Sequence, residues 1–136
     1  MSPKVRLLVV DDEKDVRLLF EQRFRREIKA GDVELVYAYS GEEALNLLRA
    51  ADMADIILIL SDINMPGMTG LELLRMVKQD LPDKGVLMIT AYGDEKTRQT
   101  AEQYGADNFV TKPIDFNMLK TRLTDLVRIY KEKKGS

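Results

Sequence analysis

The sequence predicts an α/β protein built on a doubly wound, five-stranded parallel sheet with helices on both faces. Short apolar runs alternate along the chain with segments of helical periodicity, and the connections between them are short. The most apolar run, residues 56–60, consists only of isoleucine and leucine, as expected of a central strand that helices cover on both faces. Short right-handed crossovers make the sheet parallel and doubly wound, and parallel strands have their carboxyl ends at one edge of the sheet.

Length and composition indicate a single domain. The chain has 136 residues, 45% of them hydrophobic, which is enough for one core, and no linker interrupts residues 1–136. We expect an ordered part over about residues 4–130 and a frayed tail over residues 131–136. The net charge of −2 favours neither nucleic acid nor an anionic membrane as a partner. No apolar run approaches the roughly 18 residues of a membrane span and no signal-peptide pattern is present, so we expect a cytoplasmic protein.

The chain contains neither cysteine nor histidine, which narrows the chemistry open to it. A disulfide framework, a thiol nucleophile and cysteine-bound metals are excluded. The absence of histidine removes the commonest general base, the serine–histidine pairing and the usual zinc sites. Any reaction must therefore use carboxylates, hydroxyls, lysines or a hard cation.

The first half of the chain predicts two strands, each followed by a helix. Residues 5–10 form the first strand. The helix after it has an apolar stripe composed of Val16, Leu19, Phe20, Phe24 and Ile28. Residues 33–39 form the second strand. Ser40 and Glu43 then resemble a capping box, which indicates the start of the next helix.

The second half continues the alternation after the central strand. Leu71, Leu74 and Val77 have helical spacing, and this helix ends before Pro82. Residues 85–90 and 108–111 form the last two strands. A largely polar helix lies between them, from Gly93-Asp94 to Gly105. The final helix has an apolar stripe composed of Leu119, Leu123, Leu126, Val127 and Tyr130.

Polar side chains stand where four of these strands end. Asp11 and Asp12 follow the first strand, Asp62 the third, Thr90 the fourth and Lys112 the fifth. Each has an ordinary explanation by itself: a turn, a helix cap, a β-branched strand end or a surface lysine. Because the strands are parallel, however, one edge of the sheet collects all five side chains, and open α/β sheets bind their ligands at this edge. This convergence favours a functional site.

The three gathered carboxylates predict a bound cation. Two such charges 4 Å apart repel each other by roughly 4 kcal/mol at an effective dielectric constant near 20. Either their pKa values rise or a cation joins them. Oxygen ligands alone favour Mg²⁺, which completes its shell with water or phosphate. A carboxylate beside Mg²⁺, with a lysine and a hydroxyl opposite, is suited to phosphoryl transfer onto that carboxylate.

Four motifs in this order resemble a response-regulator receiver domain of two-component signalling, most of all the stand-alone chemotaxis type. The motifs are Val-Val-Asp-Asp-Glu, Ser-Asp-Ile-Asn-Met-Pro-Gly-Met-Thr-Gly, Ile-Thr-Ala-Tyr-Gly and Phe-Val-Thr-Lys-Pro. The resemblance covers nearly the whole chain. It implies a flavodoxin-like fold with strand order 2-1-3-4-5.

The resemblance assigns roles to the three aspartates at the sheet edge and to Asn64. Asp62 would accept a phosphoryl group from a phosphohistidine on a sensor histidine kinase or a histidine phosphotransfer protein. Asp12 and Asp62 would ligate Mg²⁺ directly, Asn64 would add its backbone carbonyl, and Asp11 would act mainly through water. The chain has no histidine and cannot itself be the phosphohistidine donor.

The resemblance also implies a switch. Lys112 would pair with the phosphoryl group and precede a cis bond to Pro113. Thr90 would move to hydrogen-bond a phosphoryl oxygen, and Phe109 would swing inward into the space vacated. The helix after Gly93, the strand at residues 108–111 and the final helix would then present the change to a downstream protein target or output domain.

Three further positions are hypotheses about tuning and docking. Asn64 and Tyr92 occupy positions that flank the phosphoryl pocket in the family and vary there. We expect the bulky Tyr92 to shield the phosphoryl group and slow its hydrolysis. Leu18 lies off the apolar stripe of the first helix, next to the acidic edge, where it could help dock a kinase partner.

Three alternatives remain open from the sequence. The chain could be a receiver domain excised from a larger regulator or hybrid kinase. Haloacid-dehalogenase-like phosphatases also use an aspartate nucleophile with Mg²⁺, but they need a second aspartate two residues later, where this chain has Asn64. We therefore expect a phosphoacceptor that assists its own phosphorylation and dephosphorylation rather than a true enzyme. A flavodoxin-like FMN binder is disfavoured because its first loop should be rich in Ser, Thr and Gly, not acidic.

Overall fold

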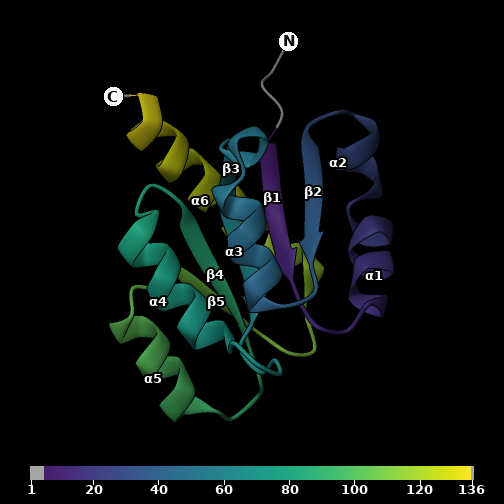
Figure 1. The fold of residues 1–136 in the computed structure, drawn as a ribbon. Helices are drawn as coiled ribbons and strands as arrows, with labels where there is room; N and C mark the ends of the chain where they lie inside the picture. Colours follow the sequence, from purple (N-terminus) through teal and green to yellow (C-terminus); the bar gives the residue numbers. More distant parts are fainter. Residues whose placement is uncertain (1–4, 136) are drawn as a thin grey trace.

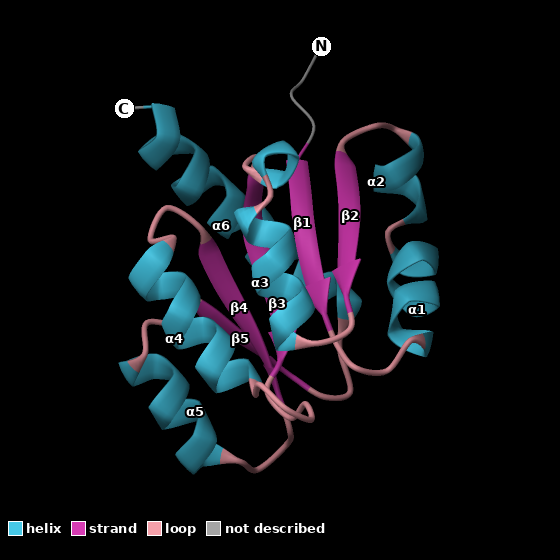
Figure 2. Ribbon diagram, in the orientation of Figure 1, coloured by secondary structure: helices cyan, strands magenta, loops and turns pink. Residues whose placement is uncertain are grey.

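The structure is a computed structural model that describes residues 5–135, in which strands and helices alternate (Figures 1 and 2). The strands are β1 (Val5–Val10), β2 (Val33–Ala38), β3 (Ile56–Asp62), β4 (Gly85–Thr90) and β5 (Asn108–Thr111). The helices are α1 (Asp15–Arg23), α2 (Arg25–Lys29), α3 (Gly41–Arg49), the single 3₁₀ turn η1 (Ala51–Met53), α4 (Gly70–Asp80), α5 (Glu95–Gln103) and α6 (Phe116–Gly135).

The five strands form one parallel sheet in the order β2-β1-β3-β4-β5. Helices α3, α4 and α5 cover one face, and α1 and α6 cover the other (Figure 1). The predicted doubly wound fold and its strand order are therefore confirmed. Val10 of β1 lies opposite Ser61 of β3, and Asp62 lies opposite Ile89 of β4, so the neighbouring carboxyl ends lie level with each other.

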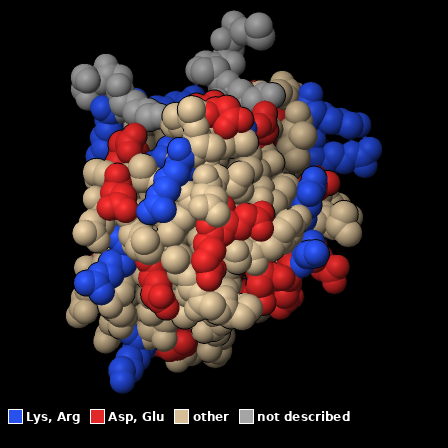
Figure 3. Space-filling view, in the orientation of Figure 1, with Lys and Arg blue, Asp and Glu red and all other residues tan. Residues whose placement is uncertain are grey.

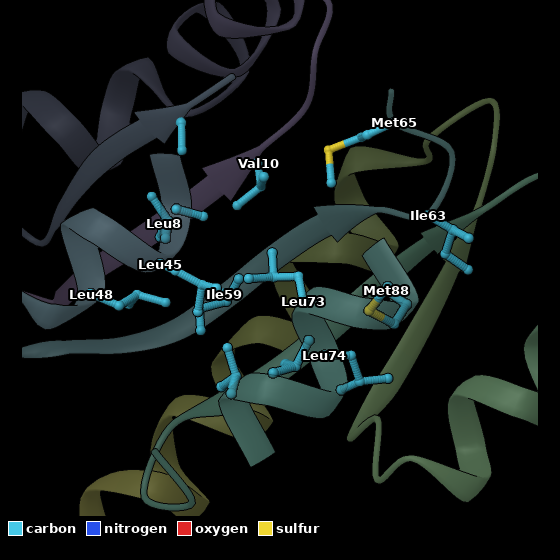
Figure 4. Packing of buried hydrophobic residues seen from close by; sticks show 14 of the residues in the cluster. Leu8, Val10, Leu45, Leu48, Ile59, Ile63, Met65, Leu73, Leu74 and Met88 are labelled. Carbon is cyan, nitrogen blue, oxygen red and sulfur yellow. The ribbon is translucent and has the colours of Figure 1, made fainter. Parts of the chain in front are cut away.

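Alternate residues of the strands face two separate hydrophobic clusters, one on each side of the sheet. Leu8 and Val10 point towards α3 and α4, where Leu45 and Leu73 pack against them (Figure 4). Leu7 and Val9 point the other way, into the cluster that contains phenylalanines of the α1 segment and leucines of α6. All seven residues of β3 are buried, as the apolar run at residues 56–60 predicts.

The first predicted helix differs from the expected single stripe because it breaks at Phe24, whose φ and ψ are −102° and 16°. The break keeps Phe24 buried, with its ring stacked on Phe20 at 5.9 Å between ring centroids. Leu19 and Ile28, counted in the same stripe, are instead 38% and 37% exposed. The buried face of this segment is therefore narrower than the periodicity suggests.

Two helix boundaries refine the sequence predictions. Ser40 caps α3 by accepting a hydrogen bond from the Glu43 backbone N–H, but the complete reciprocal capping box lies at Thr69 and Glu72 of α4. Helix α6 continues to Gly135, beyond the ordered end expected near residue 130, because no breaking residue precedes that glycine. Fraying concerns the stability of this last turn and stays a prediction, and Ser136 lies outside the described residues.

Charged side chains of both signs are interspersed over the face formed by α3, α4 and α5 (Figure 3). Within residues 5–135, no helix is both long enough and apolar enough to cross a membrane.

Candidate functional site

Three acidic side chains meet at the carboxyl edge of the sheet, as the strand ends predict. Asp11 and Asp12 follow β1 and Asp62 ends β3, and each contributes a carboxylate oxygen that lies within 4.8 Å of the other two. Asp11 and Asp62 are buried, at 5% and 4% exposure, whereas Asp12 is exposed. The cluster therefore has a buried floor and one side open to solvent, an arrangement that could hold a metal ion.

Backbone N–H groups fix the two buried carboxylates. The Glu13 N–H donates to Asp11 Oδ1 at 2.9 Å, and the Asn64 N–H donates to Asp62 Oδ1 at 3.3 Å. These contacts orient the carboxylates without neutralising their charge. Close packing of β1 against β3 then holds the acids together despite their repulsion.

The loop after Asp62 returns tightly onto the strand that it leaves. The Gly70 N–H donates to the Ile63 carbonyl at 2.8 Å. A Cβ atom at Gly70 would lie 2.1 Å from the Asp62 carbonyl oxygen, so any side chain at this position would clash with the backbone. Glycine is therefore required at the start of α4 for this loop to close beside the acidic cluster.

Lys112 completes the cluster from β5. Its Nζ lies 2.8 Å from Asp62 Oδ2, and its backbone N–H donates to the Thr90 carbonyl at 2.9 Å. The peptide bond to Pro113 is cis, as predicted. The lysine side chain is 42% exposed while that of Asp62 is 6% exposed, so the pair has one buried and one solvated partner.

The crowding of charges shifts two pKa values in a way that follows from the geometry. Burial, and secondarily the charges of Asp62 and Asp12, raises the pKa of Asp11, against the lowering effect of the Glu13 N–H and of Lys112. For Lys112, burial by itself lowers the pKa, but the hydrogen bond and charge of Asp62, together with Asp11, raise it overall. Lys112 therefore stays protonated, and the carboxylates retain excess negative charge that a cation would offset.

Replacing Asp11 with asparagine is expected to raise the free energy of unfolding by about 1 kcal/mol at neutral pH without metal. The asparagine keeps an oxygen that accepts from the Glu13 N–H but removes a buried charge beside Asp62. The native state binds the Asp11 proton more tightly than the unfolded chain does. The destabilising contribution of Asp11 should therefore shrink as pH falls through its raised folded-state pKa towards the ordinary value of 3.8.

Denaturant unfolding at a series of pH values checks this expectation. The stability difference between the wild type and Asp11→Asn should narrow on acidification. A variant that is less stable at neutral pH, or a difference that does not change with pH, would contradict it.

The remaining predicted residues lie outside the cluster of Asp11, Asp12 and Asp62. Thr90 is 3% exposed, and its hydroxyl donates to the Val110 carbonyl at 3.4 Å. Phe109 is buried in this structure, at 8% exposure. The ring therefore already has an inward position, and the structure does not show the outward position from which the predicted swing would start. The side chain of Asn64 is exposed, and Tyr92 is 89% exposed beside a hollow that Thr90 also lines.

Two arginines that the sequence analysis did not single out hold Phe109 in place. The Arg98 guanidinium lies 5.0 Å from the centre of the Phe109 ring, and Arg122 donates to the Phe109 backbone carbonyl. They come from α5 and α6 and so connect both helices to the strand between them. Neither has a local signal in the sequence, because both contacts depend on how the helices pack against β5.

Leu18, which the sequence analysis placed off the apolar stripe of the first helix, is exposed as expected, at 68%.

Comparison with known proteins matches this site and fold to one family. The sequence model of the response regulator receiver domain matches residues 7–124. A chemotaxis protein CheY homolog from Campylobacter jejuni is 32% identical over 125 residues, which cover 90% of this chain and 92% of that protein. The probable transcriptional regulator ycf27 from Guillardia theta is 34% identical over 128 residues, or 94% of this chain.

Several relatives are much longer than this chain. It spans 47% of the ycf27 regulator and 31% of a cyclic di-GMP phosphodiesterase from Thermotoga maritima. Among solved structures, a receiver domain protein from Clostridium thermocellum has the same fold, with a TM-score of 0.83 at 24% identity, covering 93% of this chain and 97% of that one. Together with the acidic cluster and Lys112, these matches show that the chain belongs to the response regulator receiver domain family of two-component signalling.

Proposed function

We propose that this receiver domain accepts a phosphoryl group on Asp62 in a Mg²⁺-dependent reaction. The observation that carries the proposal is the environment of Asp62: a buried carboxylate with Lys112 at 2.8 Å and two other acids within 4.8 Å. An isolated surface aspartate has neither the cation partner nor the metal-binding neighbours that phosphoryl transfer needs. The proposed donor is a phosphohistidine on a sensor histidine kinase or a histidine phosphotransfer protein.

The donor set fits Mg²⁺. All three side chains offer carboxylate oxygens, and one side of the cluster opens to solvent through Asp12, so water and phosphate oxygens can complete the shell. Asp12 and Asp62 would hold the ion, and the backbone carbonyl of Asn64 and a water held by Asp11 would add to the shell. When bound, the ion offsets negative charge on the transferring phosphoryl oxygens.

The residues of the chain would perform the transfer as follows. A carboxylate oxygen of Asp62 attacks phosphorus, a P–O bond forms, and the P–N bond to the donor imidazole breaks. The departing imidazole nitrogen keeps the electron pair and takes a proton from solvent. The Lys112 ammonium stays protonated and pairs with a phosphoryl oxygen, and the Asn64 N–H keeps the Asp62 carboxylate oriented for in-line attack.

Turnover would be limited to the protein's own phosphate. Position 64, two residues after the acceptor, carries an exposed amide that cannot give or take a proton as a second carboxylate would. Hydrolysis would then depend on water reaching the phosphoryl group without a dedicated base. This supports a phosphoacceptor rather than a phosphatase with external substrates.

The output would be a change in protein–protein contact at α5, β5 and α6. Thr90 would exchange its bond to the Val110 carbonyl for one to a phosphoryl oxygen, which would alter the strand that carries Phe109. Arg98 and Arg122 would transmit that change to the two helices. The partner would be a separate target protein or, as in a longer regulator, an output domain on the same chain. The receiver domain itself would contact neither nucleic acid nor membrane.

Intact mass tests the proposal. After incubation with acetyl phosphate and Mg²⁺, the protein should gain one phosphoryl group, and the gain should disappear in Asp62→Asn and after chelation of the metal. Asp83→Asn, which replaces an exposed aspartate outside the cluster, should behave as the wild type. Equal phosphorylation of Asp62→Asn, or phosphorylation that ignores the metal, would overturn the proposal.

Replacing Tyr92 with alanine is expected to shorten the phosphoryl lifetime about threefold to tenfold, because the exposed ring would fold over the site and exclude water. The measurement is loss of the added mass with time after acetyl phosphate is removed. A Tyr92→Phe variant should keep the wild-type lifetime because it keeps the ring. A lifetime unchanged by Tyr92→Ala would show that the residue has no shielding role.

A further inference from the structure

A groove of about 350 Å³ lies between the α1–α2 segment and the edge strand β2 and contains none of the acidic-cluster residues. Its lining residues are Arg17, Glu21, Arg25, Ile28, Lys29, Val33, Glu34, Leu35 and Tyr37. We call it the α2–β2 groove. The receiver mechanism proposed above makes no use of it.

The groove exists because β2 is incompletely covered. Five of its six residues are half-buried, whereas every residue of β3 and β4 is buried. The break at Phe24 and the short α2 leave the side chains of Val33 and Leu35 partly open, with Ile28 of α2 37% exposed beside them. The floor of the groove is therefore apolar and accessible to solvent.

The charges around the floor do not cancel. Glu21 pairs with Arg17 at 2.9 Å, and Glu34 pairs with Arg6 at 2.9 Å. Within the described part of the chain, Arg25 and Lys29 have no carboxylate within 4.0 Å of their charged nitrogens. Basic side chains gather at the corresponding edge of the molecule, beside α2 (Figure 3). Both acids of the groove, Glu21 and Glu34, thus form ion pairs, whereas its cations Arg25 and Lys29 form none within residues 5–135.

A buried hydroxyl gives an independent indication of a ligand. Tyr37 lines the groove, and its hydroxyl oxygen is buried without a hydrogen-bond partner among the described residues. The Arg17 guanidinium lies 5.0 Å from the centre of the Tyr37 ring and covers it. Burial also raises the pKa of this tyrosine, so its hydroxyl remains a donor at physiological pH. A buried donor without an acceptor is unfavourable, and a ligand oxygen that displaced the covering Arg17 guanidinium would satisfy it.

We propose that the α2–β2 groove binds an acidic, partly apolar segment of a partner protein. Carboxylates of the segment would pair with Arg25 and Lys29, an apolar side chain would cover Ile28 and Leu35, and an oxygen would accept from the Tyr37 hydroxyl. This gives the domain a second interaction surface, separate from the phosphoryl site and from the face at α5, β5 and α6.

The groove favours a peptide over nucleic acid. Its floor is formed by aliphatic and aromatic side chains, which an apolar side chain of a peptide can cover and a phosphate backbone cannot. Two unmatched cations can neutralise few phosphates, which leaves nucleic-acid binding weak at physiological salt. A short segment with one or two carboxylates beside an apolar residue matches the same features.

Titration of the ¹⁵N-labelled full chain with short synthetic peptides tests the proposal by NMR. The probes alternate leucine with glutamate, and matched probes carry glutamine in place of glutamate. The glutamate peptides should shift amide signals of α2 and β2, and the glutamine peptides should bind at least about fivefold more weakly. Shifts confined to other surfaces, or none at millimolar peptide, would overturn the proposal. So would tighter binding of a single-stranded oligonucleotide to the groove.

Two sets of variants make the test specific. The pair Arg25→Gln and Lys29→Gln should weaken binding about tenfold, while Lys96→Gln with Lys131→Gln, which removes the same charge elsewhere, should not. Tyr37→Phe should make the free protein slightly more stable, because it removes an unpartnered buried hydroxyl, yet weaken peptide binding about threefold to tenfold. Gained stability with unchanged binding would mean that the hydroxyl has no ligand.

Discussion

Replacing Lys112 with alanine is expected to slow phosphorylation by acetyl phosphate about 100-fold, the usual loss when a preorganised charge that stabilises a transition state is removed. The Lys112 ammonium lies 2.8 Å from Asp62 and is the only cation within 4.0 Å of that carboxylate in the described part of the chain. Its removal leaves three acids with no fixed positive partner, so an incoming phosphoryl group meets uncompensated repulsion. The initial rate of mass gain, measured with saturating Mg²⁺, gives the effect.

Lys120→Ala is the matched control. Lys120 also pairs with a carboxylate, Glu27 at 3.0 Å, but lies outside the acidic cluster. This variant should phosphorylate at the wild-type rate, and Lys112→Arg should retain part of the activity because it keeps the charge but replaces the compact ammonium with a bulkier planar guanidinium. A rate for Lys112→Ala within about twofold of the wild type would show that the lysine contributes only to packing.

Replacing Asp12 with alanine is expected to weaken Mg²⁺ binding about 100-fold, at the upper end of the 10–100-fold loss typical of residues that only support a metal ligand. Asp12 is the exposed member of the cluster and can turn an oxygen towards an ion without a penalty for leaving water. Isothermal titration calorimetry with Mg²⁺ measures the change. Without metal, the variant should be at least as stable as the wild type, since one repulsive charge is gone.

Glu13→Ala provides the comparison for Asp12→Ala. Glu13 is the next residue, is also exposed and carries the same charge, but it lies outside the cluster. Its loss should weaken Mg²⁺ binding only slightly through the general field. Equal losses in the two variants would mean that the acidic loop attracts cations without a defined site.

Much of the fold and the centre of the site could be predicted because each depends on local sequence and parallel topology. The apolar run before Asp62 fixes a buried strand, and a parallel strand delivers its last residue to the carboxyl edge. The same reasoning places Asp11 and Lys112 there, and the structure brings both close to Asp62. To predict that these side chains meet, only the order and direction of the strands must be known, not how distant elements pack.

The parts that could not be predicted depend on contacts between distant elements. The Thr90 hydroxyl bonds to the Val110 carbonyl, and the Phe109 ring is covered by Arg98, because of how β4, β5 and α5 pack. The break at Phe24 likewise occurs at a residue that is not a helix breaker, and it accompanies stacking of the Phe24 ring on Phe20. Sequence periodicity carries no information about these choices.

The α2–β2 groove could not be predicted from the sequence for the same reason. The basic run that includes Arg25 and Lys29 reads as a solvated helix end when only helical spacing is considered. Its place in the α2–β2 groove follows only from the folded structure, where the helix lies beside a half-buried edge strand with an unpartnered tyrosine hydroxyl.

The central claim, that Asp62 is the residue that carries the phosphoryl group, is tested most directly by chemical localisation. Borohydride reduces an aspartyl phosphate to homoserine, and fragmentation of the resulting peptides by mass spectrometry identifies the position. Protein treated with acetyl phosphate and Mg²⁺ should yield homoserine at position 62 and none in the untreated sample. Homoserine at position 11 or 12, or spread over several aspartates, would contradict the assignment and require a different role for Lys112.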